Sequence, residues 1–147
     1  RKRWWEQVRE MQKTPGWEKI YIANTCSQIG VRVTRLIDAE FIVDKAAALA
    51  PPPSDTVAWA GDGGTGFGVA VPYRQLLPKK VDNLLCCGRM LGAPDTLDPL
   101  RLITPCMTTG EAAGVAAAMA AKRGVKPRDL DVKSLREKLA AANVYLG

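Results

Sequence analysis

The sequence predicts an α/β fold, and three segments carry that prediction. Leu84 to Cys87 is a continuous apolar run of strand length, of the kind found inside parallel sheets. Val69 to Tyr73 is a second short run with strand character. A helix of small residues follows, starting at about Pro105 or Thr109 and ending at Lys122, with Gly124 as its C-cap. Apolar strands beside a small-residue helix indicate an α/β layer arrangement.

The N-terminal part of the chain predicts a helix and then irregular β structure. Residues Arg1 to Lys13 carry apolar side chains at helical spacing, and Thr14–Pro15–Gly16 ends the helix. Ile20 to Ile22 suits a short strand, and Gly30 to Val43 has strand character in two pieces. Ala46 to Ala50 fits one helical turn, because three prolines follow it.

The remaining segments are predicted as loops, turns and a final helix. Ser54 to Gly68 is a glycine-dense loop, and Pro78–Lys79–Lys80 is a turn. Arg89 to Ile103 is a long loop that contains two prolines. An amphipathic helix from about Val132 to Ala142 closes the chain, with Leu135 and Leu139 four residues apart on its apolar face.

The composition excludes several classes of site. The chain has 147 residues, which suits one globular domain, and 47% of them are hydrophobic. It contains no histidine, which removes Ser-His-Asp and Cys-His catalysis and histidine metal sites. The four cysteines form no CxxC pair, so we predict reduced thiols, no metal site and a cytoplasmic location. In a strand, Cys86 and Cys87 would point to opposite faces.

Net charge and hydropathy indicate a chain with two basic ends and no membrane span. The net charge is +6, and basic residues gather at Arg1–Lys2–Arg3 and from Lys122 to Lys138. Solvated helix faces explain this pattern best, and a nucleic-acid surface is the weaker alternative because no binding motif accompanies the charge. The longest apolar run, Ala112 to Ala121, is too short to span a membrane. Because the chain begins with Arg1 rather than Met, we expect a processed chain or a fragment.

One glycine motif matches a dinucleotide-binding pattern but is predicted not to bind a dinucleotide. Residues Gly61 to Gly66 match G-x-G-x-x-G, which in a dinucleotide site ends a strand and opens a helix. Here the run from Phe67 to Pro72 follows, and it has strand chemistry with a proline where a helix would continue. We therefore reject a dinucleotide site and predict a hairpin loop or lid.

A second glycine-containing pattern is a better candidate for a ligand site. The apolar run ends at Gly88–Arg89, and about twenty residues later comes the segment Thr108 to Gly114. Thr108 and Glu111 have capping-box spacing, while Thr104–Pro105 offers an earlier helix start. Free amides at such a helix tip can hold a phosphate or the electron-rich edge of a reduced flavin. A small-residue helix that merely docks on a strand explains the pattern equally well.

Four patches of the chain together resemble the C-terminal part of the FAD-dependent oxidoreductases with a glutathione-reductase-like fold. In order, the patches are Gln28-Ile29-Gly30-Val31-Arg32 with Thr34-Arg35, Val71-Pro72-Tyr73-Arg74 through Leu76-Leu77-Pro78-Lys79, Val81-Asp82-Asn83-Leu84-Leu85 to Gly88-Arg89, and Cys106-Met107-Thr108-Thr109-Gly110-Glu111-Ala112-Ala113-Gly114. Their order and spacing cover nearly the whole chain. The resemblance implies the C-terminal part of that FAD-binding fold, plus part of its substrate-binding region, without the N-terminal Rossmann unit.

The resemblance also implies a cofactor and its contacts. The cofactor would be FAD, with the backbone N–H groups of Thr109, Gly110 and Glu111 facing the flavin. The implied cofactor-binding residues are Gly88, Arg89, Met90, Thr108, Thr109, Gly110, Glu111 and Ala112. Candidates to hold an anionic substrate are Arg32, Arg35, Arg74 and Arg101, each of which could equally be a surface or ion-pair arginine. The pattern identifies no catalytic residue.

The implied organisation divides the chain into three segments. Residues 1–80 would belong to the substrate-binding region with the N-terminal helix, 81–125 to the last strand and helix of the FAD-binding domain, and 126–147 to a C-terminal helix. The missing FAD-binding portion would come from another chain or from residues outside this sequence, and an oligomer is expected. Many relatives carry a histidine shortly after the Gly-Arg pair, where this sequence has Ala93-Pro94-Asp95-Thr96. A non-catalytic assembly subunit is therefore the alternative to an enzyme part.

Overall fold

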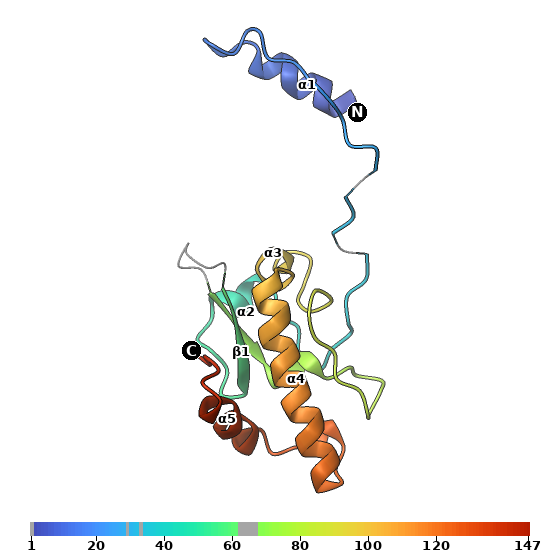
Figure 1. Ribbon diagram of the computed structural model, residues 1–147, viewed down its shortest axis with the longest axis vertical. Coiled ribbons are helices and arrows are strands. Elements are labelled where there is room, and N and C mark those ends of the chain that lie inside the picture. The colour runs from blue at the N-terminus through green and yellow to red at the C-terminus, as the bar shows by residue number, and fades with distance from the viewer. Residues whose placement is uncertain (1, 29, 33, 62–67) are drawn as a thin grey trace. The chain divides into compact units, whose positions relative to one another are not determined.

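The computed structural model describes residues 2–28, 30–32, 34–61 and 68–147, which form two compact units, Arg1–Arg32 and Val33–Gly147. In the first unit, helix α1 spans Lys2–Met11, as predicted, and none of its residues is buried (Figure 1). The apolar side chains of Trp4, Trp5 and Met11 are exposed. The strand predicted at Ile20 to Ile22 is wrong, because these residues pair with no neighbouring strand.

The second unit contains a two-stranded antiparallel sheet. Strand β1 spans Thr56–Gly61 and strand β2 spans Gly68–Pro72, with Ala58 opposite Val71 and Gly61 opposite Gly68. Strand β2 confirms the prediction for this segment. The loop predicted from Ser54 is wrong for the residues of β1. The strands predicted in Gly30 to Val43 are also wrong among the described residues, where Ala39 makes a single bridge to Pro78.

The strands on either side of the G-x-G-x-x-G motif confirm that it is no dinucleotide site. Residues 62–67 lie outside the described part of the chain, but the strand before them and the strand after them pair with each other. At Gly68 the chain enters β2 instead of a helix. The motif therefore joins two antiparallel strands and lacks the strand-to-helix context that a pyrophosphate requires.

Helices contribute more residues to the second unit than strands do. The other helical segments are α2 (Lys45–Leu49), η1 (Tyr73–Leu76), α3 (Leu97–Leu100), α4 (Ile103–Arg123), η2 (Pro127–Asp129) and α5 (Val132–Ala141). Alanine-rich composition favours the long helix α4, and Gly124 ends it in the left-handed conformation, with φ at 65°. Asp131 caps α5 by accepting from the amides of Lys133 and Ser134. The predicted loop from Arg89 contains α3, a difference from prediction.

The core lies between α4 and the hairpin. Figure 1 shows α4 crossing the sheet, and its buried face is made of small side chains, including Ala112, Ala116 and Ala120. Small residues let the helix approach the strands closely, where Val57 and Val69 are fully buried. Leu135 and Leu139 of α5 complete the same cluster. This core contains residues from each of the three segments that the resemblance implied, 1–80, 81–125 and 126–147. The chain after Arg32 therefore forms one compact unit.

Buried Tyr73 ties η1 to the C-terminal part of the unit. Its hydroxyl donates to the carbonyl oxygen of Pro127 at 2.8 Å, across 54 residues. Burial, and then the charge of Glu40, raise the pKa of Tyr73 to about 12. The raised pKa means that the folded state favours the neutral phenol. The corresponding stability is complete below pH 10, the usual phenol pKa, and is lost as pH rises towards about 12.

Replacing Tyr73 by phenylalanine is expected to lower the free energy of unfolding at pH 7 by about 1 kcal/mol, the net value of one hydrogen bond. It should also flatten the fall in stability between pH 10 and about 12. Chemical denaturation at pH 7, 10 and 11 measures both effects. Tyr145→Phe is the control, because that ring is 68% exposed. An equally steep alkaline loss in Tyr73→Phe would show that other groups control it.

The architecture is compatible with the α/β class, since helices pack on a small two-stranded sheet. Among the described residues, no helix is both long enough and apolar enough to cross a bilayer.

Candidate functional site

The segment Asn83 to Gly88 runs beside α4 and is held at three points. At its start, Asp82 forms ion pairs with Lys126 at 2.9 Å and Arg128 at 3.0 Å. In its middle, the amide of Cys86 donates to the carbonyl of Leu76 at 2.9 Å. At its end, the amide of Gly88 donates to the hydroxyl of Thr109 at 3.1 Å. The segment is therefore positioned by both the turn before it and the helix beside it.

The predicted buried strand at Leu84 to Cys87 is wrong for this structure. No strand is assigned there, and Leu84 is 44% exposed. Within the described residues, the amides of Leu84, Leu85 and Cys87 donate to no acceptor, whereas the amide of Cys86 does. An apolar segment whose amides are mostly unused resembles a strand that lacks a paired neighbour.

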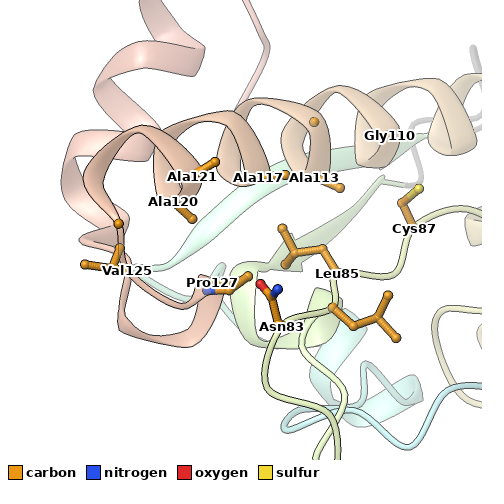
Figure 2. Close-up of a pocket in the computed structure, with 13 residues that line it drawn as sticks. Asn83, Leu85, Cys87, Gly110, Ala113, Ala117, Ala120, Ala121, Val125 and Pro127 are labelled. Atoms are coloured by element: carbon orange, nitrogen blue, oxygen red, sulfur yellow. The ribbon is translucent and has the colours of Figure 1, made fainter.

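A groove of about 590 Å³ separates this segment from α4 (Figure 2). In Figure 2, Leu85 and Cys87 project from the segment towards the helix. The helix side is a stripe of glycine and alanine at helical spacing. The lining residues on α4 and just beyond it are Gly110, Ala113, Gly114, Ala117, Ala120, Ala121, Gly124, Val125 and Pro127. Such a stripe leaves the helix backbone accessible to whatever occupies the groove.

The stripe faces open space at its two helical glycines. A methyl group built on Gly110 or on Gly114 meets no atom within 4 Å apart from the neighbouring helix backbone. Neither glycine is therefore required by packing inside the described chain. Glycine also costs a helix interior about 1 kcal/mol relative to alanine. Close approach by a group that is not part of the described chain would explain both positions.

Residues Gly88 to Leu91 form a tight turn next to α4. The amide of Leu91 donates to the carbonyl of Gly88 at 3.1 Å, and Gly88 has a positive φ of 80°. The amide of Ile37 donates a hydrogen bond to the carbonyl of Met90 at 3.0 Å. Among the described residues, the amides of Arg89 and Met90 donate to no acceptor. Two successive unused amides can donate to a ligand that carries acceptor atoms.

Helix α4 begins earlier than the predicted site requires. It starts at Ile103, with Leu102 as an N-cap that makes no side-chain bond. The amides of Thr109, Gly110 and Glu111 therefore lie inside the helix, where each pairs with the carbonyl four residues earlier. That these amides face a flavin stays a prediction, since in this conformation they lie within the helix and not at its tip. The capping box is not formed either, since the Thr108 hydroxyl donates back to Pro105 at 3.2 Å.

The other predicted cofactor-binding residues divide by burial. Gly88, Arg89 and Met90 lie together on the turn, and Thr108 and Gly110 are half-buried, with Gly110 on the groove. Glu111 is exposed but does not line the groove. Thr109 and Ala112 are fully buried, so their side chains belong to the core.

Comparison with known proteins decides the family. A family model described as FAD dependent oxidoreductase matches residues 1–139, nearly the whole chain. The chain belongs to the FAD-dependent oxidoreductase family. Its cofactor is accordingly FAD and its general function is that of a flavin oxidoreductase, which suggests an enzyme. Searches of the curated proteins and of the solved structures returned no significant match.

In this FAD-dependent oxidoreductase, the residues of the Gly88 to Leu91 turn and of the neighbouring groove have the chemistry to hold part of FAD. FAD is rich in acceptor atoms, and the turn offers the two unused amides of Arg89 and Met90. Gly110 carries no side chain where a methyl group would enter open space. The fit rests on these positions and not on the tip of α4, where Leu102 and Ile103 are exposed apolar residues.

The four candidate substrate arginines have different surroundings, and each is described within its own unit. Arg32 lies in the first unit, and Arg35 is an exposed residue of the second. Arg74 is exposed but already paired: its guanidinium lies 2.8 Å from Asp55 and 4.8 Å from the centre of the Phe41 ring. The hydrogen bond to Asp55 raises the pKa of Arg74. Arg101 is half-buried near the start of α4.

The thiols next to the groove differ in their surroundings. Burial, and then the neighbouring Cys87, raise the pKa of the Cys86 thiol, so it stays protonated at neutral pH. Cys87 lines the groove and Cys86 does not, which agrees with the expectation that the pair points to opposite sides. A protonated thiol is a weak nucleophile, and the geometry gives Cys86 no catalytic task.

Two parts of the site escaped the sequence reasoning. The first is the stripe on α4, whose glycines and alanines recur at three- and four-residue spacing and could have been found by that period. The second is the hydroxyl of Thr109, which bonds the Gly88 turn. No local pattern predicts a bond across 21 residues.

Proposed function

We propose that this chain is the C-terminal part or subunit of an FAD-dependent oxidoreductase that transfers hydride or electrons between a small organic substrate and flavin. When bound, FAD supplies the redox chemistry. The observation that supports this most directly is the turn from Gly88 to Leu91, which offers the unused amides of Arg89 and Met90 beside the bare helix at Gly110. These residues would hold part of the cofactor and orient it.

The proposal includes a second polypeptide portion that supplies the dinucleotide-binding strand and helix. The G-x-G-x-x-G motif of this chain does not provide it, since it joins two antiparallel strands. The groove supplies a place for such a portion: a strand beside Leu84 to Cys87 would pair with the unused amides of Leu85 and Cys87. The small residues of α4 would then cover that strand, as glycine and alanine allow close packing.

A non-catalytic assembly subunit is the second candidate, and the loop after the turn favours it. The Thr96 hydroxyl donates to the carbonyl of Val43 at 2.5 Å, and the amide of Ala93 donates to the same carbonyl at 3.2 Å. Asp95 accepts from the amide of Lys45 at 3.3 Å. The loop in which many relatives place a histidine is thus used here to hold the segment from Val43 to Lys45.

Reconstitution with flavin tests the proposal. The chain is expressed alone and together with a polypeptide that carries a strand–G-x-G-x-x-G–helix unit, and the visible spectrum of each preparation is recorded. We expect flavin absorbance to copurify with the pair and to be weak or absent with the chain alone, because the chain holds only part of the cofactor. A pair that takes up no flavin would contradict the proposal.

Substrate reduction separates the two candidate functions. Anaerobic addition of candidate small organic substrates should bleach the flavin of an enzyme and leave that of an assembly subunit oxidised. Arg35→Gln is a suitable variant for the substrate contact, because this exposed arginine forms no ion pair with any other described residue.

A further inference from the structure

Thr109 links the turn at Gly88 to helix α4 through a fully buried hydroxyl. Its side chain is 0% exposed. The hydroxyl accepts the Gly88 amide at 3.1 Å and donates to the carbonyl of Pro105 at 2.7 Å. Donation to the carbonyl four residues back occupies the hydroxyl proton, which leaves the oxygen lone pairs for Gly88. The orientation of the acceptor is thus set by the helix itself.

The backbone of the turn depends on Gly88. Its φ of 80° lies in the left-handed region, which favours glycine, and a methyl group there would be 3.6 Å from the Cys106 sulfur, at ordinary contact distance. Conformation and not lack of space therefore selects glycine. The turn is anchored at Gly88 by Thr109 and at Met90 by Ile37. The unused amide of Arg89 lies between these two residues, and the other unused amide belongs to Met90 itself. Loss of the Thr109 bond would release one end.

We propose that Thr109 is a positioning residue for the cofactor: by holding the Gly88 amide, it sets the direction in which the Arg89 and Met90 amides point. The proposal rests on the proposed function, in which this turn holds part of FAD. Thr109 touches the turn and not the cofactor, because its side chain is enclosed by the core. Its role differs from the backbone contact that the resemblance implied, since its own amide lies inside α4.

Thr96 provides a matched control. It is also buried, at 4% exposure, and its hydroxyl also joins two backbone groups, accepting the Ala93 amide at 3.0 Å and donating to Val43 at 2.5 Å. Thr96→Val therefore removes a buried hydroxyl with the same bonding pattern from a different loop. Both valine variants should lose similar stability, whereas only Thr109→Val releases Gly88.

The experiment compares Thr109→Val, Thr109→Ser and Thr96→Val in the full chain assembled with its FAD-binding portion. The readouts are amide hydrogen exchange at Gly88 without cofactor, and the dissociation constant of FAD from flavin fluorescence. We expect Thr109→Val to speed Gly88 exchange and weaken FAD binding, each by about tenfold, the equivalent of one hydrogen bond. Thr109→Ser should restore both, and Thr96→Val should change neither. If Thr109→Val does not fold, Thr109→Ala removes the same hydroxyl with a good helix former.

The possible outcomes separate the inference from the proposed function. If FAD binds the wild type and Thr109→Val equally, or if Thr109→Val and Thr96→Val weaken binding by the same factor, the positioning role is overturned and the proposed function stands. Unchanged Gly88 exchange in Thr109→Val overturns the role as well. If the wild-type assembly takes up no FAD at all, the proposed function itself fails, and the inference fails with it.

Discussion

Replacing Gly114 by leucine is expected to weaken assembly with the FAD-binding portion by roughly 100-fold while leaving the chain itself folded. Gly114 is exposed on the groove side of α4, and an added methyl group meets nothing within 4 Å. Leucine is also the better helix former by roughly 0.5–1 kcal/mol, so stability should hold or rise. In the assembly, the same side chain would occupy the space of the docked strand. We expect a loss of about 3 kcal/mol in binding, or roughly 100-fold in affinity.

Calorimetric titration of the two portions measures the expected loss of affinity. Thermal unfolding of the chain alone measures whether its stability is retained. Ala118→Leu is the control, because Ala118 is an exposed residue of the same helix that does not line the groove. It should leave both affinity and unfolding temperature near those of the wild type. Undiminished assembly by Gly114→Leu would mean that the groove is not where the second portion binds.

Replacing Leu135 by alanine is expected to cost about 2–5 kcal/mol of unfolding free energy, the usual range for a large-to-small change in a core. Leu135 is fully buried and holds α5 in the same hydrophobic cluster as the hairpin and α4. The cavity left behind would lie within this cluster. A loss of that size is a large part of the stability of a typical domain.

Denaturant unfolding measures the effect of Leu135→Ala, with Leu49→Ala as the comparison. Leu49 is 69% exposed, and its truncation should change the free energy of unfolding by less than about 0.5 kcal/mol. Equal midpoints for the two variants would show that α5 is not part of a cooperative core. Flavin binding by the assembled Leu135→Ala protein should fall only in proportion to its unfolded fraction, since Leu135 lines no part of the groove.

In the proposed function, the groove and the turn together would hold part of a flavin site. The segment from Asn83 to Gly88 is anchored at Asp82, Cys86 and Gly88 even though it lacks strand neighbours. Lys126, and then Arg128, lower the pKa of Asp82, so the ion pairs at the start of the segment persist at neutral pH. The chain therefore presents a preformed edge, and less ordering is required when a second portion binds.

The sequence by itself determined the features that depend on nearby residues. The end of α4 at Gly124, the final helix from Val132 and strand β2 all follow from composition, caps and turn residues within a few positions. The four family patches in register also come from sequence alone, and the family match over residues 1–139 confirms what they implied about FAD. The G-x-G-x-x-G motif was rejected because β-rich residues follow it and Pro72 falls where the interior of a helix would have to continue.

Only the tertiary structure decided the features that depend on distant partners. Leu84 to Cys87 has the composition of a strand, but a strand needs a paired neighbour, and the described residues supply none on one edge. Strand β1 escaped prediction for the converse reason, since its pairing with β2 outweighs the glycine-rich composition beside it. From the sequence alone, no bonding partner could be assigned to the Thr109 hydroxyl. It acquires a role only because folding brings Gly88 to within 3.1 Å of it.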